Sequence, residues 1–296
     1  MSKASELRSL IKRGGMTIAP GAYDCITAKL IEHAGFDAVY MTGAGTAAAH
    51  GFPDYGLLTM SEMVTNAGKI AATVDVPVVA DADTGYGNEL NVTRTVHEYV
   101  RHGVAAIHIE DQVFPKKCGH LDNKEVIPAD DYIAKIRAAA DARGNSDFIV
   151  IARTDSRAVI GFDEAIKRAN AALAAGADIA FVEAPQTLDE VAQVPKLVKG
   201  PCLLNVVGRG KTPPVELKDA EAMGYKLAIL PTLLFRGVIG CCEELLAEVK
   251  QGKFPAPPKN LSPHEAFARF GAEEWDALRE RYRSPAQDKV KIAKAG

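Results

Sequence analysis

Short apolar runs rich in β-branched residues alternate along most of the chain with longer, amphipathic stretches. The repeat is roughly 30 residues long, which is the spacing of successive βα units. Several amphipathic stretches end on glycine, as Ala34-Gly35 and Met223-Gly224 do, where helices commonly stop. The pattern therefore predicts strands at 17–19, 38–41, 76–80, 105–109, 148–152, 179–182, 202–205 and 227–230, and helices at 24–33, 61–73, 91–102, 129–142, 163–174 and 216–223.

The eight predicted strands are nearly continuously apolar, which is typical of parallel strands buried on both faces of a sheet. Eight strands alternating with helices fit a closed (β/α)₈ TIM barrel better than an open sheet. A doubly wound open sheet is the alternative. The fold class is thus α/β.

A C-terminal extension follows the eighth predicted strand. Leu233 to Lys250 read as the last barrel helix, residues 254–258 are rich in proline, and residues 264–281 form a polar, helical tail. We expect a catalytic barrel domain at 1–252 and an arm with helical extension at 253–296. A tail attached through a stiff proline-rich arm cannot easily bury its own apolar residues. We therefore expect the tail to pack on the barrel or on a neighbouring subunit.

Composition restricts the partners of the chain. Hydrophobic residues make up 47% and charged residues 25%, as in globular proteins, and the net charge of -3 provides no basic surface for nucleic acid or a membrane. Residues 1–13 lack the apolar segment of a signal peptide, so we expect a cytoplasmic enzyme with a small-molecule substrate. The five cysteines lack Cys-x-x-Cys spacing, which argues against a disulfide framework and against a zinc site.

Polar residues stand at the carboxyl end of nearly every predicted strand. In a barrel these ends converge on one mouth, where the active site of this fold is built. The residues are Thr42, Asp81, Asp83, Glu110, Asp111, Arg153, Asp155, Glu183 and Asn205.

Four of the acids predict a metal site. Asp81, Asp83, Glu110 and Asp54 would form an all-oxygen cluster, which suits Mg²⁺ or Mn²⁺ rather than zinc. The alternative is that Asp81 and Glu110 are strand-end caps that pair with Arg153.

The remaining candidates are a cation, a thiol and two glycine-rich segments. Arg153 could grip a substrate carboxylate in bidentate fashion or form an internal ion pair with Asp155 or Glu183, and Arg236 is a weaker candidate. Cys118, flanked by Lys117 and His120, has an electropositive setting that suits proton transfer or nucleophilic attack. The segments at 205–212 and 43–48 depart from the P-loop and dinucleotide-binding patterns, although 43–45 could still offer backbone N–H groups to an anion.

Four motifs in order along the chain resemble the isocitrate lyase and phosphoenolpyruvate mutase superfamily. They are Asp81-Ala-Asp-Thr-Gly-Tyr-Gly, Glu110-Asp-Gln, Lys116-Lys-Cys-Gly-His120 and Ala152-Arg-Thr-Asp155. The resemblance implies a (β/α)₈ barrel with its last helix swapped between subunits, a homotetramer built from such dimers, a Mg²⁺ cofactor and a mobile loop that carries the cysteine.

The resemblance also implies a function for each site residue. Asp81 and Asp83 would hold Mg²⁺, with Asp54 and Glu110 contacting it through water. Cys118 would donate a proton to an enolate, and Tyr40 would act as a base or relay. The other catalytic candidates are His120, Glu183 and Lys116, and the substrate-binding candidates are Thr42, Gly43, Ala44, Gly119, Arg153, Asn205 and Arg236.

The expected reaction is a retro-aldol type cleavage of a small 2-hydroxy dicarboxylate, releasing a 2-oxo acid such as pyruvate. The segment Asn205-Val-Val-Gly-Arg-Gly-Lys-Thr-Pro213 is similar to dimethylmalate lyases and carboxyphosphonoenolpyruvate mutases rather than to typical methylisocitrate lyases, so a 2-alkylmalate is favoured over a tricarboxylate. A phosphonomutase that forms a P–C bond is one rival hypothesis, and a non-catalytic metabolite-binding barrel is another.

Overall fold

A computed structural model of the chain describes residues 2–283. Contacts divide the chain into two compact units, Met1–Gly240 and Cys241–Gly296, with the division inside helix α11. The domain boundary expected after residue 252 follows the end of α11 (Leu233–Lys250), and it stays a prediction.

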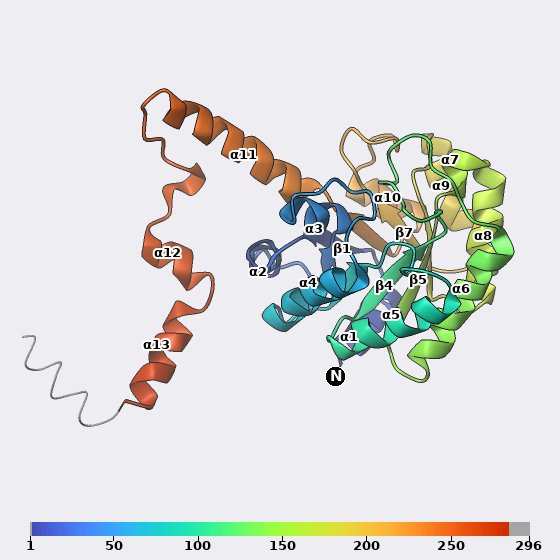
Figure 1. Ribbon diagram of the computed structural model, residues 1–296, viewed down its shortest axis with the longest axis horizontal. Helices are drawn as coiled ribbons and strands as arrows, with labels where there is room; N and C mark the ends of the chain where they lie inside the picture. Colours follow the sequence, from blue (N-terminus) through green and yellow to red (C-terminus); the bar gives the residue numbers. More distant parts are fainter. Residues whose placement is uncertain (1, 284–296) are drawn as a thin grey trace, which may run out of the picture. The chain divides into compact units, whose positions relative to one another are not determined.

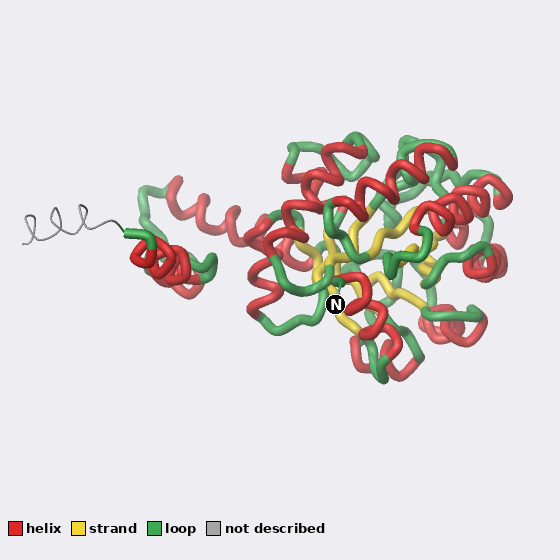
Figure 2. The backbone as a smooth tube through the Cα atoms, turned by 90° about the horizontal axis from the view of Figure 1, so that it is seen from below, coloured by secondary structure: helices red, strands yellow, loops and turns green. Residues whose placement is uncertain are grey.

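Eight parallel strands in sequence order close the first unit into a barrel. Figure 2 shows the strands at the centre of this unit with helices around them. The predicted (β/α)₈ fold is thereby confirmed, and the doubly wound alternative is wrong. The strands are β1 (Thr17–Ala22), β2 (Val39–Met41), β3 (Val78–Asp81), β4 (Ala106–Glu110), β5 (Ile149–Thr154), β6 (Ile179–Val182), β7 (Cys202–Asn205) and β8 (Leu227–Leu230).

The helices around the barrel follow the predicted stretches, with four additions. Those expected from the sequence are α2 (Cys25–His33), α4 (Met60–Thr73), α5 (Glu89–Arg101), α6 (Ala129–Arg143), α8 (Phe162–Ala174) and α10 (Leu217–Met223) (Figure 1). The additions are α1 (Lys3–Lys12), α3 (Gly43–Ala49), α7 (Ser156–Val159) and α9 (Leu188–Leu197). Three of these added helices have compositions that do not predict a helix, since α1 is polar, α3 begins Gly-Ala-Gly and α9 contains Pro195.

Helix α1 closes the amino-terminal end of the barrel. Leu7 and Ile11 are buried and pack with the residues that fill the barrel interior. Arg8 fixes the helix there by donating to the Phe148 carbonyl at 3.0 Å and to Asp178 Oδ1 at 2.9 Å. The interior therefore opens only at the other end, where the carboxyl ends of the strands meet.

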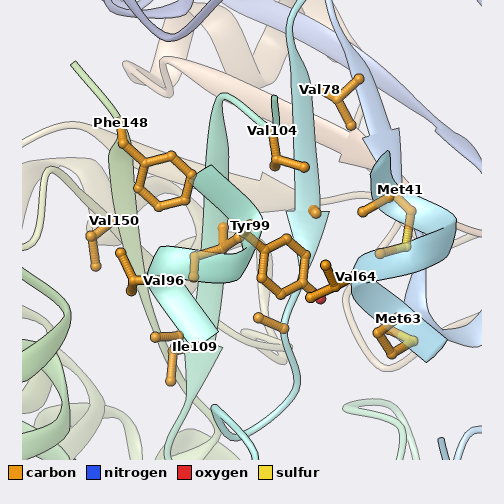
Figure 3. Packing of buried hydrophobic residues seen from close by; sticks show 14 of the residues in the cluster. Met41, Met63, Val64, Val78, Val96, Tyr99, Val104, Ile109, Phe148 and Val150 are labelled. Atoms are coloured by element: carbon orange, nitrogen blue, oxygen red, sulfur yellow. The ribbon is translucent and has the colours of Figure 1, made fainter. Parts of the chain in front are cut away.

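A second apolar layer lies between strands and helices and reaches the site through one hydroxyl group. Figure 3 shows Tyr99 of α5 among Val64, Val78, Val96 and other buried side chains. The Tyr99 hydroxyl donates to the backbone carbonyl of Asp81 at 2.9 Å. The core thus positions the end of β3 directly.

The second unit contains the carboxyl-terminal part of α11, the 3₁₀ turn η1 (Pro258–Asn260), α12 (Pro263–Ala268) and α13 (Ala272–Arg281). The tail predicted as one helix at 264–281 is two helices, because Gly271 adopts φ of 76° and interrupts it. Several large apolar side chains of this unit are exposed, Leu246, Phe267 and Trp275 among them. Within residues 2–283, no helix has the length and apolar character needed to cross a bilayer.

Candidate active site

A cavity of about 70 Å³ lies at the mouth of the barrel, where the strand ends converge. Eleven of the sixteen predicted site residues line it, namely Tyr40, Thr42, Ala44, Asp54, Asp81, Cys118, Gly119, His120, Arg153, Glu183 and Asn205. A larger cavity of about 350 Å³ beside α5 is lined, among the described residues, by no carboxylate, thiol or imidazole. The smaller cavity is therefore the candidate active site.

The strand ends bring the predicted acids together. Asp81 ends β3, Asp83 follows it, Glu110 ends β4, and all three are buried, whereas Asp54 is half-buried on the loop after α3. Asp83 has φ of 45°, an uncommon conformation for a residue with a side chain, and its N–H donates to Asp81 Oδ1 at 2.9 Å. The backbone is thus turned so that two carboxylates two residues apart share one end of the barrel.

The acids carry more negative charge than their neighbours balance. Burial raises the pKa of Asp83 to about 6 and also raises the pKa of Glu110. Burial opposes ionisation of Asp81 too, but His108, Lys116 and Arg153 nearby lower its pKa to about 2. The positive charges of Lys116, beside Asp83, and of Arg153, beside Glu110, therefore do not offset the effect of burial on these two carboxyl groups.

Lys116 lies inside the acid cluster rather than beside it. Its side chain is 2% exposed, and Nζ contacts Asp54 and lies 2.9 Å from Asp83 Oδ1. The ammonium supplies one positive charge between two of the four acids. Its pKa is raised, since Asp54 and Asp83 outweigh the opposing effect of burial.

Arg153 forms internal ion pairs and also lines the cavity. Its Nε donates to Asp155 Oδ2 at 2.9 Å, and its Nη1 lies 3.0 Å from Glu110 Oε2. The pair with Asp155 was one of the alternatives for this residue, and the pair with Glu110 was part of the alternative to the metal site; no ion pair joins Arg153 and Glu183 among the described residues. The guanidinium is nevertheless part of the cavity wall and can offer N–H groups to an anion there.

Cys118 lies on the loop between β4 and α6 and reaches the cavity. Its backbone N–H donates to the Asp54 carbonyl at 3.1 Å, which ties the loop to the segment after α3. Burial, assisted by the charge of Asp54, raises the pKa of the thiol to about 11. The electropositive setting expected from Lys117 and His120 does not determine the pKa, because the Lys117 ammonium donates to the Asn123 carbonyl and burial has the largest effect; the thiol is protonated at neutral pH.

Glu183, Asn205 and His120 form a hydrogen-bonded group on the other side of the cavity. Asn205 Nδ2 donates to both Glu183 oxygens at 3.2 Å, and His120 Nε2 lies 3.2 Å from Glu183 Oε1. His120 Nδ1 accepts the backbone N–H of Lys211 at 3.0 Å, which places the ring proton on Nε2, facing Glu183.

Tyr40 lies deeper, on β2. Its hydroxyl is 2.8 Å from His108 Nε2 and 3.4 Å from Asp81 Oδ2, and the two rings stack with centroids 5.8 Å apart. Burial raises the pKa of Tyr40 well above its usual value, while burial lowers the pKa of His108 to about 4. The phenol is protonated here, which favours the relay over the base among its two predicted functions.

The other predicted residues take supporting positions. Gly43 begins α3 and has no room for a side chain, because a Cβ would lie 2.8 Å from Asp81 Cγ. The Thr42 side chain caps the same helix. Arg236 is exposed on α11, donates to the Gly208 carbonyl and is not part of the described cavity wall.

Comparison with known proteins shows to which family the chain belongs. The family model for phosphoenolpyruvate phosphomutase matches residues 7–250. The chain belongs to the phosphoenolpyruvate phosphomutase family. The resemblance predicted from the motifs around Asp81 and Cys118 is confirmed.

Two similar members of this family are lyases. The 2,3-dimethylmalate lyase of Eubacterium barkeri is 49% identical over 233 residues, covering 78% of this chain and 81% of its own. The 2-methylisocitrate lyase of Aeropyrum pernix strain K1 is 44% identical over 245 residues, covering 83% of this chain and 79% of its own.

Solved structures of the family share the fold over nearly the whole length. A 2,3-dimethylmalate lyase structure has a TM-score of 0.91 at 40% identity, covering 97% of this chain and 98% of its own. An oxaloacetate acetylhydrolase with the inhibitor 3,3-difluorooxalacetate has a TM-score of 0.92 at 35% identity and 94% and 96% coverage. A phosphonopyruvate hydrolase complex with oxalate and Mg²⁺ has a TM-score of 0.86 at 31% identity and 95% and 99% coverage.

The acid cluster fits a divalent cation in its chemistry. Glu110 Oε1 is buried and has no hydrogen-bond partner among the described residues, while Glu110 Oε2 and Asp83 Oδ1 are buried beside Arg153 and Lys116. In residues 2–283, no three His, Cys, Asp or Glu side chains converge in ligand geometry, because Lys116 stands between Asp54 and Asp83. The donors present are all oxygen, which is the preference of Mg²⁺.

Several residues of the site carry no recognisable signal in the sequence. Phe181, Val207, Ile229, Pro231 and Thr232 complete the cavity wall. Phe181 and Ile229 are interior residues of strands and look like any other core position. His108 could have been suspected, since it is the one polar residue within an otherwise apolar run at 104–109.

Proposed function

We propose that the protein is a Mg²⁺-dependent carbon–carbon lyase that cleaves a small 2-hydroxy dicarboxylate to a 2-oxo acid and a second carboxylate. One observation carries the proposal: a protonated thiol, Cys118, faces the same cavity as a buried acid cluster and the Arg153 guanidinium. A lyase needs these three elements, namely an acid for the carbanion, a charge-stabilising centre and an anchor for a carboxylate.

The cavity favours a branched diacid over a tricarboxylate. Among the described residues of its wall, Arg153 is the one Arg or Lys, and Phe181, Val207, Ile229 and Pro231 supply apolar surface. An alkyl group on the apolar wall and a carboxylate at Arg153 describe a 2-alkylmalate.

The reaction begins when the substrate hydroxyl gives its proton to the Tyr40 oxygen while the Tyr40 hydroxyl gives its own proton to His108 Nε2, 2.8 Å away, and the resulting imidazolium is stabilised by Asp81. The carbon–carbon bond then breaks, the hydroxyl carbon becomes the carbonyl of the 2-oxo acid, and the bonding electrons pass to the second fragment as an enolate. Cys118 donates its proton to the carbon of that enolate. Arg153, Asn205 and the start of α3 hold the carboxylates, and Glu183 orients His120 and Asn205.

Asp81 and Asp83 would hold Mg²⁺ or Mn²⁺, with Asp54 and Glu110 around it. The bound ion would supply positive charge that stabilises oxygen anions at the 2-oxo end. Glu110 Oε1, which has no partner among the described residues, supports this proposal, as does the Mg²⁺ that accompanies oxalate in the related phosphonopyruvate hydrolase.

The test is product formation from a panel of acids. Purified protein with Mg²⁺ is incubated with 2,3-dimethylmalate, citramalate, 2-methylisocitrate and oxaloacetate, and 2-oxo acid or oxalate is measured. We expect pyruvate from an alkylmalate, with Cys118→Ser inactive and Cys25→Ser, a matched control outside the site, active. Absence of product from every acid would refute the proposal.

Two further measurements separate the rival functions. Phosphorus NMR detects a phosphonate product, which would indicate the mutase activity carried by the 40% identical carboxyvinyl-carboxyphosphonate phosphorylmutase of Arabidopsis thaliana. Calorimetry measures Mg²⁺ binding, and its failure together with absent turnover would favour a metabolite-binding barrel.

We also propose a cytoplasmic homotetramer made of two helix-swapped dimers. The exposed Leu246, Phe267, Trp275 and Tyr282 of the second unit support an assembly, because so much apolar surface on one small helical unit usually marks an interface. Light scattering tests the assembly, since a tetramer of the 31.6-kDa chain has four times that mass. A monomeric mass would exclude it.

A further inference from the structure

Lys124 is a buried ammonium in an otherwise exposed stretch of loop. Its side chain is 1% exposed, whereas Leu121, Asp122, Asn123 and Glu125 around it are all exposed. Burying a lysine is costly unless its charge is paired, so a side chain turned inward from such a loop has a specific partner. The predicted functions of the site residues leave this lysine unexplained.

Lys124 bonds two parts of the active site at once. Its Nζ donates to Asp155 Oδ1 at 2.6 Å and to the backbone carbonyl of Gly119. Gly119 belongs to the loop that carries Cys118, while Asp155 lies just after β5 on the rigid barrel. Lys124 is therefore a direct link between the loop and the barrel.

The barrel end of this link is also the partner of Arg153. Asp155 is fully buried and accepts from Arg153 Nε at 2.9 Å and from Nη2 at 3.2 Å, so one carboxylate serves two cations. Asp111 holds Asp155 in turn, because Asp111 Oδ1 accepts the Asp155 backbone N–H at 2.7 Å. The position of Asp155 is thus fixed by the barrel and not by the loop.

The loop end of the link lies against the catalytic groups. A Cβ on Gly119 would be 2.5 Å from Arg153 Nη2 and 2.7 Å from Glu183 Cδ, so the backbone of the loop touches both side chains. The bond from Lys124 to the Gly119 carbonyl holds the backbone in that contact. Other ties of the loop are the Cys118 N–H to the Asp54 carbonyl, the Lys116 ammonium to Asp54 and Asp83, and His120 to Glu183 and to the Lys211 N–H.

The charges change when the loop is seated. Arg153 alone lies between two carboxylates, those of Asp155 and Glu110, which together neutralise more than its single charge. Lys124 places a second positive charge beside Asp155. Asp155 then neutralises less of the Arg153 charge, so the guanidinium attracts an incoming carboxylate more strongly. Seating the loop therefore strengthens the anion site as well as covering it.

We propose that Lys124 is a positioning residue that couples the seating of the Cys118 loop to the carboxylate grip of Arg153, with Asp155 as the shared partner. The proposal rests on the lyase function for its kinetic consequence, but the seating of the loop can be measured without turnover.

The main variant is Lys124→Met, which keeps the length of the side chain and leaves Asp155 paired with Arg153. The matched control is Lys117→Met on the same loop, where the ammonium donates only to the Asn123 carbonyl at 3.1 Å. Lys124→Arg restores the charge. Urea unfolding of the three variants tests whether the barrel is as stable as in the parent protein.

Loop seating is read by hydrogen exchange of peptides that cover residues 116–124. In Lys124→Met these amides should exchange about tenfold faster or more, because two charge-assisted hydrogen bonds are lost, and β5 amides should be unchanged. Lys124→Arg should recover part of the protection, and Lys117→Met should behave as the parent protein. Equal exchange in Lys124→Met and the parent would overturn the proposal.

Binding and turnover provide the second readout. Calorimetry with oxalate and Mg²⁺ should show weaker oxalate binding in Lys124→Met, and kcat/KM for the alkylmalate should fall about 100-fold, as expected for misplaced catalytic groups. If no acid of the panel is cleaved, the lyase proposal fails while exchange and oxalate binding still decide on Lys124. Unchanged oxalate affinity in Lys124→Met would refute the coupling to Arg153.

Discussion

Gly119→Ala is the smallest change that tests whether the Cys118 loop must touch the barrel. The added methyl group would lie 2.5 Å from Arg153 Nη2 and still closer to Glu183 Oε1, and ordinary contact begins at 3.4 Å, so something must move by at least about 0.9 Å. The end of a free arginine would move easily. Arg153, however, is held by Asp155 and Glu110, and Glu183 on the other side is held by Asn205.

The loop is therefore expected to give way rather than the barrel. A displacement of about 1 Å in a catalytic group lowers rates by roughly 100-fold, which is equivalent to about 2.7 kcal/mol of transition-state stabilisation. The free energy of unfolding should change by less than about 1 kcal/mol, because the loop can lift without disturbing the core. Activity and stability should thus separate in this variant.

The assay compares kcat/KM for an alkylmalate with urea unfolding in the same buffer. Gly14→Ala is the control, since a Cβ there meets nothing within 4 Å and the residue is exposed. Parent-like kcat/KM in Gly119→Ala would show that the loop does not close onto Arg153 and Glu183, and the reasoning would be wrong.

Three further predictions concern single groups. At pH 8, without metal or substrate, iodoacetamide should alkylate Cys118 slowly, because a pKa of about 11 leaves roughly one thiol in a thousand ionised. A rate of Cys118 alkylation that stops rising with pH below pH 9 would contradict this prediction. In the absence of metal, Asp83→Asn should raise the free energy of unfolding at pH 8 by about 1 to 3 kcal/mol, since burial raises the Asp83 pKa to about 6 and ionisation of Asp83 above that pH costs stability. This gain should vanish near pH 4. Calorimetry should find Mg²⁺ affinity at least about 100-fold lower in the variant. Arg153→Lys should lower kcat/KM by about 100-fold with little change in Mg²⁺ affinity, because an ammonium cannot reproduce the forked donors, and equal kinetics would exclude Arg153 as the carboxylate anchor.

Much of the fold is encoded locally and was predictable. Buried parallel strands are apolar throughout, so the runs ending at Val182, Asn205 and Leu230 were located to the residue. The acids at strand ends were predictable for the same reason, because the topology of a barrel brings consecutive strand ends together whatever the loops do.

The features that the sequence did not reveal depend on tertiary contacts. Lys124 lies in a polar segment in which an exposed lysine is the ordinary expectation, and only the folded loop turns it toward Asp155. Lys117, seven residues earlier, has the same chemistry and points elsewhere. The raised pKa of Cys118 was not predicted for a related reason, since the charges nearby in sequence indicated only an electropositive setting, whereas burial has the largest effect on the pKa.

The closure of the amino-terminal end of the barrel by α1 has a consequence for the order in which products are released. Leu7 and Ile11 close the amino-terminal end of the barrel, so both products must leave through the mouth by which the substrate entered. In the proposed reaction, the fragment that Cys118 protonates would lie nearer the loop, and the 2-oxo acid would lie deeper, against the strand-end acids. Release should therefore be sequential, with the monocarboxylate fragment departing first and the 2-oxo acid acting as a competitive product inhibitor.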